Sequence, residues 1–244
     1  MPKAERYFTT GHRYHLTHRC HNRDFLFRFA KDRDVYREML RTRLSKYRTP
    51  LLGYCITSNH VHLVVTAVNE TRISEFMDCL EGDFAQYYNK RKKRSGAFWG
   101  GRYHAVAIEE GGYLWNCLSY VELNMVRAGT VNHPSEWRWC SYGELMGIRQ
   151  RYRLIDRGHF AETFQQDPDS ESFRANYQES IRSRLRAGEL KREPEWTESL
   201  AAGGEAFVEG ISGQILSRRR MDTDRVKNGQ RGMWILKENG VQYA

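Results

Sequence analysis

The chain has 244 residues, of which 40% are hydrophobic and 28% charged, and its net charge at pH 7 is +9. These proportions are typical of a globular protein and exclude a chain that is disordered throughout. No apolar run reaches the roughly 18 residues of a membrane-spanning helix, and no apolar stretch follows the N-terminal charges as in a signal peptide. We therefore expect a cytoplasmic protein that does not bind a membrane.

The positive charge is concentrated in the N-terminal part of the chain. Residues 1–145 carry 22 basic and 15 acidic groups, whereas residues 146–244 carry 17 and 15. A basic surface attracts polyanions through counterion release, so nucleic acid is one candidate partner and an ordinary solvated surface is the alternative. The five cysteines are scattered and form no Cys-x-x-Cys pair, which argues against a disulfide framework or a zinc ribbon.

The hydrophobic pattern predicts an α+β domain in residues 1–145. The expected strands are 13–20, 51–57, 60–66 and 102–109, and the expected helices are 32–47, 72–92 and 113–127. A two-residue turn at 58–59 makes its flanking strands antiparallel neighbours. This order is close to a ferredoxin-like, split βαβ arrangement, in which helices flank an antiparallel sheet.

Residues 146–244 give weaker signals. Apolar residues at a spacing of four predict helices at 170–187 and 205–218, and polar or glycine-rich segments separate them. We expect a mainly helical C-terminal extension that forms a second domain, and the sequence indicates no role for it.

Two histidines in the predicted strand 60–66 are the first candidates for chemistry. Side chains two residues apart in a strand project to one face, so His60 and His62 point away from the core that Val61 and Leu63 enter. Two imidazoles at this separation are able to bind one divalent ion. The alternative is that both histidines lie on the exposed face of the strand and have no functional role.

The predicted helix 113–127 presents a polar stripe at helical spacing, which consists of Tyr113, Asn116, Tyr120, Asn124 and Arg127. The amide oxygen of Asn124 is able to complete the coordination of a metal ion. The phenol of Tyr120 is able to act as a nucleophile. The alternative is that the two tyrosines only pack at the edge of the sheet.

Between these elements, a run of cations precedes an aromatic segment. The residues are Lys90, Arg91, Lys92, Lys93 and Arg94, followed by Trp99, Arg102 and Tyr103. Cations attract phosphates and unstacked bases stack on aromatic rings, so the pattern indicates contact with single-stranded nucleic acid. A solvated helix end followed by a loop with buried aromatic residues explains the pattern equally well.

Three segments occur together in the order found in one known family. They are Ser-Asn-His-Val-His-Leu-Val-Val at 58–65, Ser-Gly-x-x-Trp-x-Gly-Arg-Tyr at 95–103 and Tyr-Val-Glu-Leu-Asn-x-Val-Arg-Ala-Gly at 120–129. Over about residues 6–145 the chain closely resembles the REP-associated tyrosine transposases, a branch of the single-tyrosine HUH transposases. The resemblance implies an enzyme that nicks and joins single-stranded DNA at hairpin or repeat sequences through a 5′-phosphotyrosine intermediate.

The resemblance also implies roles for individual residues. His60 and His62 become ligands of Mg²⁺ or Mn²⁺, Asn124 takes the place of the third ligand, and Tyr120 becomes the nucleophile. Tyr113, seven residues earlier on the same stripe, is the rival nucleophile. The cationic and aromatic residues of 90–103, together with Arg127, are the expected DNA contacts. Relatives occur as monomers and as homodimers that exchange tyrosines, and both arrangements remain open.

Four further histidines lie in and around the first predicted strand. His12 and His18 face opposite to His15 and His21 in a strand, which argues against one shared zinc site. His15 is able to contact DNA from the first strand.

A rolling-circle replication initiator or relaxase shares the chemistry of the leading hypothesis. A domesticated protein that binds hairpin DNA without cutting it is the non-enzymatic alternative.

Overall fold

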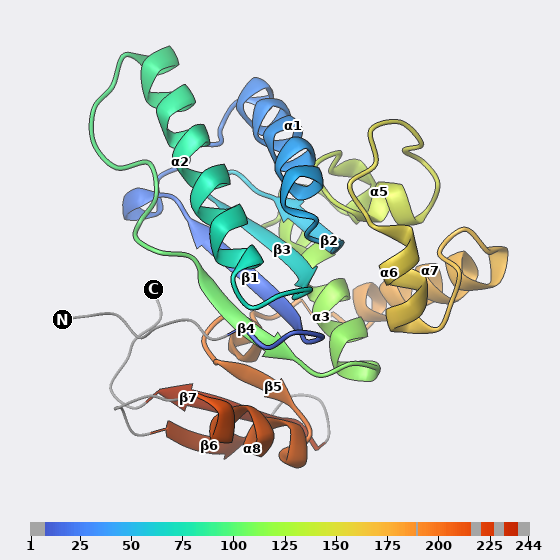
Figure 1. The fold of residues 1–244 in the computed structure, drawn as a ribbon. Helices are drawn as coiled ribbons and strands as arrows, with labels where there is room; N and C mark the ends of the chain where they lie inside the picture. The colour runs from blue at the N-terminus through green and yellow to red at the C-terminus, as the bar shows by residue number, and fades with distance from the viewer. Residues whose placement is uncertain (1–7, 189, 216–220, 227–231, 239–244) are drawn as a thin grey trace.

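The computed structural model describes residues 8–188, 190–215, 221–226 and 232–238 (Figure 1). Its strands are β1 (Arg13–Arg19), β2 (Leu51–Ile56), β3 (His60–Thr66), β4 (His104–Ile108), β5 (Ala201–Gly203), β6 (Met221–Arg225) and β7 (Trp234–Glu238). Its α-helices are α1 (Ala30–Tyr47), α2 (Arg72–Lys92), α3 (Gly112–Glu122), α4 (Asn124–Arg127), α5 (Tyr142–Leu145), α6 (Arg157–Phe164), α7 (Glu171–Arg186) and α8 (Glu205–Gln214). The predicted α+β class is confirmed.

The strands form one seven-stranded sheet in the order β2-β3-β1-β4-β5-β7-β6. β1 pairs antiparallel with β3 and β4, and β2 pairs antiparallel with β3, as the short turn predicts. Helices α1 and α2 pack together on one face of this sheet, and α3 packs against β2, β3 and β4 (Figure 1). Within the described ranges, no helix is both long and apolar enough to cross a lipid bilayer.

The C-terminal extension contains more strand than the sequence predicts. It is helical through α7, as expected, and then adds β5, β6 and β7 to the same sheet, with β5 running parallel to β4. β5 has only three residues, and the Met-Asp-Thr-Asp-Arg segment of β6 lacks an apolar alternation. Neither strand therefore carries the periodic signal on which a sequence-based prediction depends. Helix α8 ends at Gln214, and residues 216–218 of the predicted helix lie outside the described residues.

The predicted helix 113–127 is interrupted once. Leu123 has φ −79° and ψ 3°, so α3 ends before it and the short α4 follows. Gly129, at φ +64°, then ends the segment, because a residue without a Cβ adopts this left-handed conformation readily. The break separates Tyr120 on α3 from Asn124 on α4.

Glu122 anchors the end of α3 inside the protein. Its carboxyl group accepts hydrogen bonds from the hydroxyl of Ser141 at 2.6 Å and from the phenol of Tyr177 on α7 at 2.8 Å. Burial raises the pKa of Glu122 to about 8, so this side chain is mainly protonated at neutral pH. The C-terminal extension therefore helps to hold the helix that carries Tyr120.

The close approach of α3 to β2 requires a glycine at position 53. A Cβ atom at Gly53 would overlap the side chain of Leu118, whereas a Cβ atom at Gly82 on the exposed side of α2 would meet nothing within 4 Å. We expect Gly53→Ala to destabilise the fold by about 1–3 kcal/mol through overpacking. Gly82→Ala, the matched control, should stabilise it by up to about 1 kcal/mol, because alanine favours a helix. Thermal unfolding checks both, and an unchanged midpoint for Gly53→Ala would contradict the packing described here.

Candidate active site

β3 and the α3–α4 segment bring four of the predicted site residues together within one chain. The rings of His60 and His62 lie 4.7 Å apart between centroids and are nearly perpendicular. The ring of Tyr120 lies 6.1 Å from that of His62, and the amide nitrogen of Asn124 lies 2.8 Å from His62 Nε2. The histidine pair, the amide and the phenol therefore meet at one place, where the strand face and the helix end oppose each other.

His15 fixes the orientation of His62. Its Nδ1–H donates to the carbonyl oxygen of Trp196 at 2.7 Å, because a carbonyl only accepts. A neutral His15 then accepts at Nε2 from His62 Nδ1–H, at 2.8 Å. The lone pair on His62 Nε2 is consequently directed toward Asn124. His15 is 0% exposed, so its side chain does not reach the surface from which it was considered able to contact DNA.

His60 is oriented by its own turn. Its Nδ1–H donates to the side-chain oxygen of Asn59 at 2.6 Å, which leaves the lone pair of Nε2 available. Burial lowers the pKa of His60 to about 3 and that of His15 to about 4, and it lowers the pKa of His62 well below its usual value. The nearby positive charge of Arg19 acts in the same direction on His60. All three imidazoles are therefore neutral at physiological pH.

This donor set fits a divalent metal ion. Two neutral imidazole nitrogens and one amide oxygen are ordinary ligands for ions such as Mn²⁺, and for Mg²⁺ where phosphate oxygens share the coordination. Rotation of the Asn124 amide by half a turn exchanges its nitrogen and oxygen, so the oxygen reaches the position that faces His62. In the part of the chain that the structure describes, no cluster of three or more His, Cys, Asp or Glu side chains is arranged as a metal site. The amide of Asn124 is the polar group that contacts His62 Nε2 beside the pair.

Arg127 lies over the candidate nucleophile. Its guanidinium carbon is 3.8 Å from the centroid of the Tyr120 ring, and it donates to the Tyr120 carbonyl oxygen at 2.9 Å. Burial raises the pKa of the Tyr120 phenol, and the charge of Arg127 offsets part of that rise. Tyr120 is therefore protonated at neutral pH, and Arg127 holds a positive charge beside its ring.

Arg19 is a second cation at the site, and the sequence analysis missed it. It pairs with His60 across the β1–β3 ladder and interacts electrostatically with both His60 and Tyr120. Alternation along β1 places residues 15, 17 and 19 on the face that His60 and His62 occupy. The pairing of β1 with β3 was the information needed to find Arg19 and to assign His15 its role of orienting His62.

The structure does not bring Tyr113 to the histidine pair. The seven residues between Tyr113 and Tyr120 correspond to about 10 Å along a helix. The Tyr113 hydroxyl donates to the carbonyl oxygen of Gly232 at 3.2 Å, next to β7. Asn116, between them on the predicted stripe, offers its carbonyl to Arg184 of α7 at 3.2 Å. Tyr120, Asn124 and Arg127 are therefore the members of the stripe that meet His62.

Of the aromatic residues predicted to stack on bases, Tyr103 is buried and Trp99 is partly buried. Trp99 stacks on His18, with ring centroids 4.1 Å apart, and its indole nitrogen donates to the Glu81 carbonyl. Tyr103 is only 3% exposed. Trp99 is only partly buried, so the predicted DNA contacts of Trp99 and Tyr103 stay predictions.

The predicted cations occupy the C-terminal end of α2 and the loop after it. Lys90, Lys93 and Arg102 are exposed, and Arg91 forms an ion pair with the buried Asp32. The loop lies against the end of β1, where Gly100 donates its backbone N–H to the carbonyl oxygen of Arg19 at 2.9 Å. These cations therefore lie at the end of the sheet at which β3 begins with His60.

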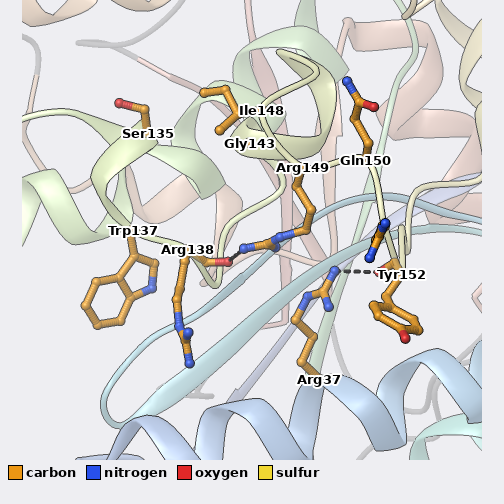
Figure 2. Close-up of a pocket in the computed structure, with 10 residues that line it drawn as sticks. Arg37, Ser135, Trp137, Arg138, Gly143, Ile148, Arg149, Gln150 and Tyr152 are labelled. Atoms are coloured by element: carbon orange, nitrogen blue, oxygen red, sulfur yellow. Dashed lines mark hydrogen bonds between the residues drawn. The ribbon is translucent and has the colours of Figure 1, made fainter.

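An open pocket of about 540 Å³ lies beside β2 and contains none of the predicted site residues (Figure 2). Arg37, which lines it, donates to the carbonyl oxygen of Tyr152 at 2.7 Å and forms an ion pair with Glu144 at 2.8 Å. Arg149, also in the lining, donates to the phenol of Tyr54 at 3.0 Å. These two arginines are thus engaged with groups of the protein itself.

Comparisons with known proteins find similarity to transposases. Residues 8–124, which include His60, His62, Tyr120 and Asn124, match the family described as IS200-like transposases. A solved REP-associated tyrosine transposase bound to a REP hairpin is 16% identical, with a TM-score of 0.49 over 64% of this chain and 93% of that chain. A candidate transposase from Deinococcus radiodurans R1 is 16% identical, with a TM-score of 0.36 over 53% and 98%. No curated protein matches the chain.

Proposed function

We propose that the chain is a metal-dependent endonuclease and strand transferase for single-stranded DNA, because residues 8–124 match the IS200-like transposase family. The proposal is carried by one observation, the convergence of His60, His62, Asn124 and Tyr120 within one chain. Because Tyr120 lies beside the histidine pair of its own chain, a monomer acting in cis is sufficient for this chemistry.

The proposed reaction exchanges one phosphodiester for another. The Tyr120 oxygen attacks the scissile phosphorus, a P–O bond to the phenol forms, and the bond to the 3′ oxygen breaks. The phenol loses one proton and the departing 3′ oxygen gains one, so the products are a 5′-phosphotyrosine and a free 3′-hydroxyl. Attack by another 3′-hydroxyl reverses the step and joins strands without an external energy source, because the covalent link preserves a phosphodiester.

Each protein group has a defined part in this step. His60 and His62 offer their Nε2 lone pairs and Asn124 its amide oxygen to the metal ion, which when bound withdraws charge from the phosphate. Arg127 and Arg19 supply positive charge next to Tyr120, where negative charge develops. Burial of the phenol keeps it protonated until the phosphate is in place.

We propose a hairpin or repeat end with an adjoining single-stranded segment as the target, as in the REP-associated branch of the family. The exposed cations Lys90, Lys93 and Arg102 at the His60 end of the sheet support binding to the phosphate backbone. The C-terminal extension belongs to the site as well, because the carbonyl oxygen of Trp196 orients His15 and thereby His62. The catalytic unit in this proposal therefore extends beyond residue 145.

A labelled hairpin DNA with a single-stranded flank tests the function directly. The protein is incubated with the DNA in the presence and absence of Mn²⁺, and the products are separated under denaturing conditions. We expect a Mn²⁺-dependent covalent band that carries a label placed at the 3′ end of the strand, while a 5′ label is released with the other fragment. A native band shift without any covalent band would favour the non-cutting hairpin binder. Cleavage confined to a replication or transfer origin would favour an initiator or relaxase.

A further inference from the structure

The loop between β1 and α1 exposes two aromatic side chains. Phe25 is 67% exposed and Phe29 is 53% exposed, whereas Phe27 between them is fully buried against Tyr36 and Phe84. Single exposed apolar residues are common on protein surfaces, but two phenylalanines that flank a buried anchor in one short loop form a local apolar surface. The buried Phe27 holds this surface in place.

This loop is joined to the turn that carries His60. The backbone N–H of Phe27 donates to the Ser58 carbonyl at 2.9 Å. The Asn59 side chain donates through its amide nitrogen to the Arg23 carbonyl at 3.1 Å, and its oxygen accepts from His60 Nδ1 at 2.6 Å. One asparagine thus connects the loop with a predicted metal ligand. In Figure 1 the loop lies next to the segment after α2.

One cation lies against Phe29, and further exposed cations occur in the same loop and at the end of α2. The ammonium nitrogen of Lys92 lies 4.3 Å from the centroid of the Phe29 ring. Arg23 and Arg28, in the same loop, are exposed, and so is Lys93 at the end of α2. Aromatic faces beside cations suit unpaired nucleotides, since the bases stack on the rings while the phosphates interact with the positive charges.

We propose that Phe25 and Phe29 form a base-stacking platform for unpaired nucleotides of the DNA strand that passes the His60 turn. This proposal rests on the proposed function and deepens it, because it names the surface that holds single-stranded DNA beside the scissile phosphate. Arg23 and Arg28 contact the phosphates of the same nucleotides. Phe25 and Phe29 are more exposed than Trp99, which is partly buried and stacks on His18, and than Tyr103, which is buried.

Binding of single-stranded oligonucleotides in excess chelator tests the platform without cleavage. Stacking is worth about 1–3 kcal/mol per base, so Phe25→Ala and Phe29→Ala should each weaken binding at least about fivefold. The salt dependence of binding should stay unchanged, because no phosphate contact is removed. Tyr152→Ala is the matched control, since Tyr152 is an equally exposed aromatic residue (70%) beside β2, and it should bind like the wild type.

Abasic nucleotides identify the contact as stacking. Scanning single abasic positions along the oligonucleotide should weaken binding by the wild type at one or two positions. At those positions, removal of the base should not weaken DNA binding by the Phe25→Ala/Phe29→Ala double variant any further. Phe25→Trp should retain affinity, and Phe25→Leu, which keeps apolar bulk without an aromatic face, should not.

Two outcomes would overturn the platform. One is wild-type affinity in the double variant. The other is that the wild type sediments as a dimer, the double variant sediments as a monomer, and their DNA affinities are equal. The phenylalanines would then bind a second copy of the chain. The platform and the proposed function fail separately. Base-dependent binding without any Mn²⁺-dependent adduct contradicts only the function, and an adduct with unchanged affinity of the phenylalanine variants contradicts only the platform.

Discussion

Tyr120→Phe should abolish the covalent protein–DNA adduct and lower strand cleavage by at least about a thousandfold, as expected when the nucleophile of a covalent mechanism is removed. The substitution deletes a single hydroxyl group. It keeps the ring that packs under Arg127, at 3.8 Å, and beside His62, at 6.1 Å. DNA binding should therefore be retained, and a native gel shift beside a denaturing gel separates the two effects.

Tyr113→Phe is the matched control for this experiment. It removes a phenolic hydroxyl from the same helix, where that group donates to the Gly232 carbonyl, and costs about 1 kcal/mol of stability at most. The adduct should form at the wild-type rate. If Tyr120→Phe still formed the adduct and Tyr113→Phe did not, the nucleophile would be Tyr113, and the geometry of α3 would have to change on DNA binding.

The predictions from sequence succeeded where the determining pattern is local. The alternation in residues 60–66 placed His60 and His62 on one face of β3, and helix 72–92 was predicted with the bounds that α2 has. A spacing of four placed Asn124 one turn after Tyr120. This relation survives the break at Leu123, because the backbone N–H of Leu123 still donates to the carbonyl four residues before it and its carbonyl still accepts from the N–H four residues after it. Such patterns depend only on the 2.0 and 3.6 residue periods of strands and helices.

The missed residues depend on contacts between distant parts of the chain. His15 orients His62 only because β1 pairs with β3, and it is held in turn by Trp196, 181 residues further along. The aromatic residues of 95–103 were ambiguous for another reason. Tryptophan and tyrosine serve equally well in a core and on a nucleobase, and the structure shows Trp99 stacked on His18 while still partly exposed. The residue types in that loop are the same whether the rings pack in the core or stack on nucleobases.

His62→Ala should eliminate metal-stimulated cleavage, with a loss of at least about a hundredfold. Changing a group that only orients a ligand typically weakens metal binding or activity 10–100-fold, and His62 is itself the proposed ligand. His62 also connects His15 with Asn124, so its removal leaves both without their partner. Calorimetric titration with Mn²⁺ should show the loss of binding independently of cleavage.

His159→Ala provides the control for the loss of an imidazole. His159 lies on α6, half-exposed, and pairs with Asp156 at 3.2 Å, far along the chain from β3. It should bind Mn²⁺ and cleave DNA like the wild type. Two results would contradict the metal assignment: wild-type Mn²⁺ affinity in His62→Ala, or full cleavage by the wild type in excess chelator. The second result would mean that only Arg127 and Arg19 support Tyr120 as a nucleophile. Arg127→Ala should then abolish cleavage, which would identify this metal-independent mechanism.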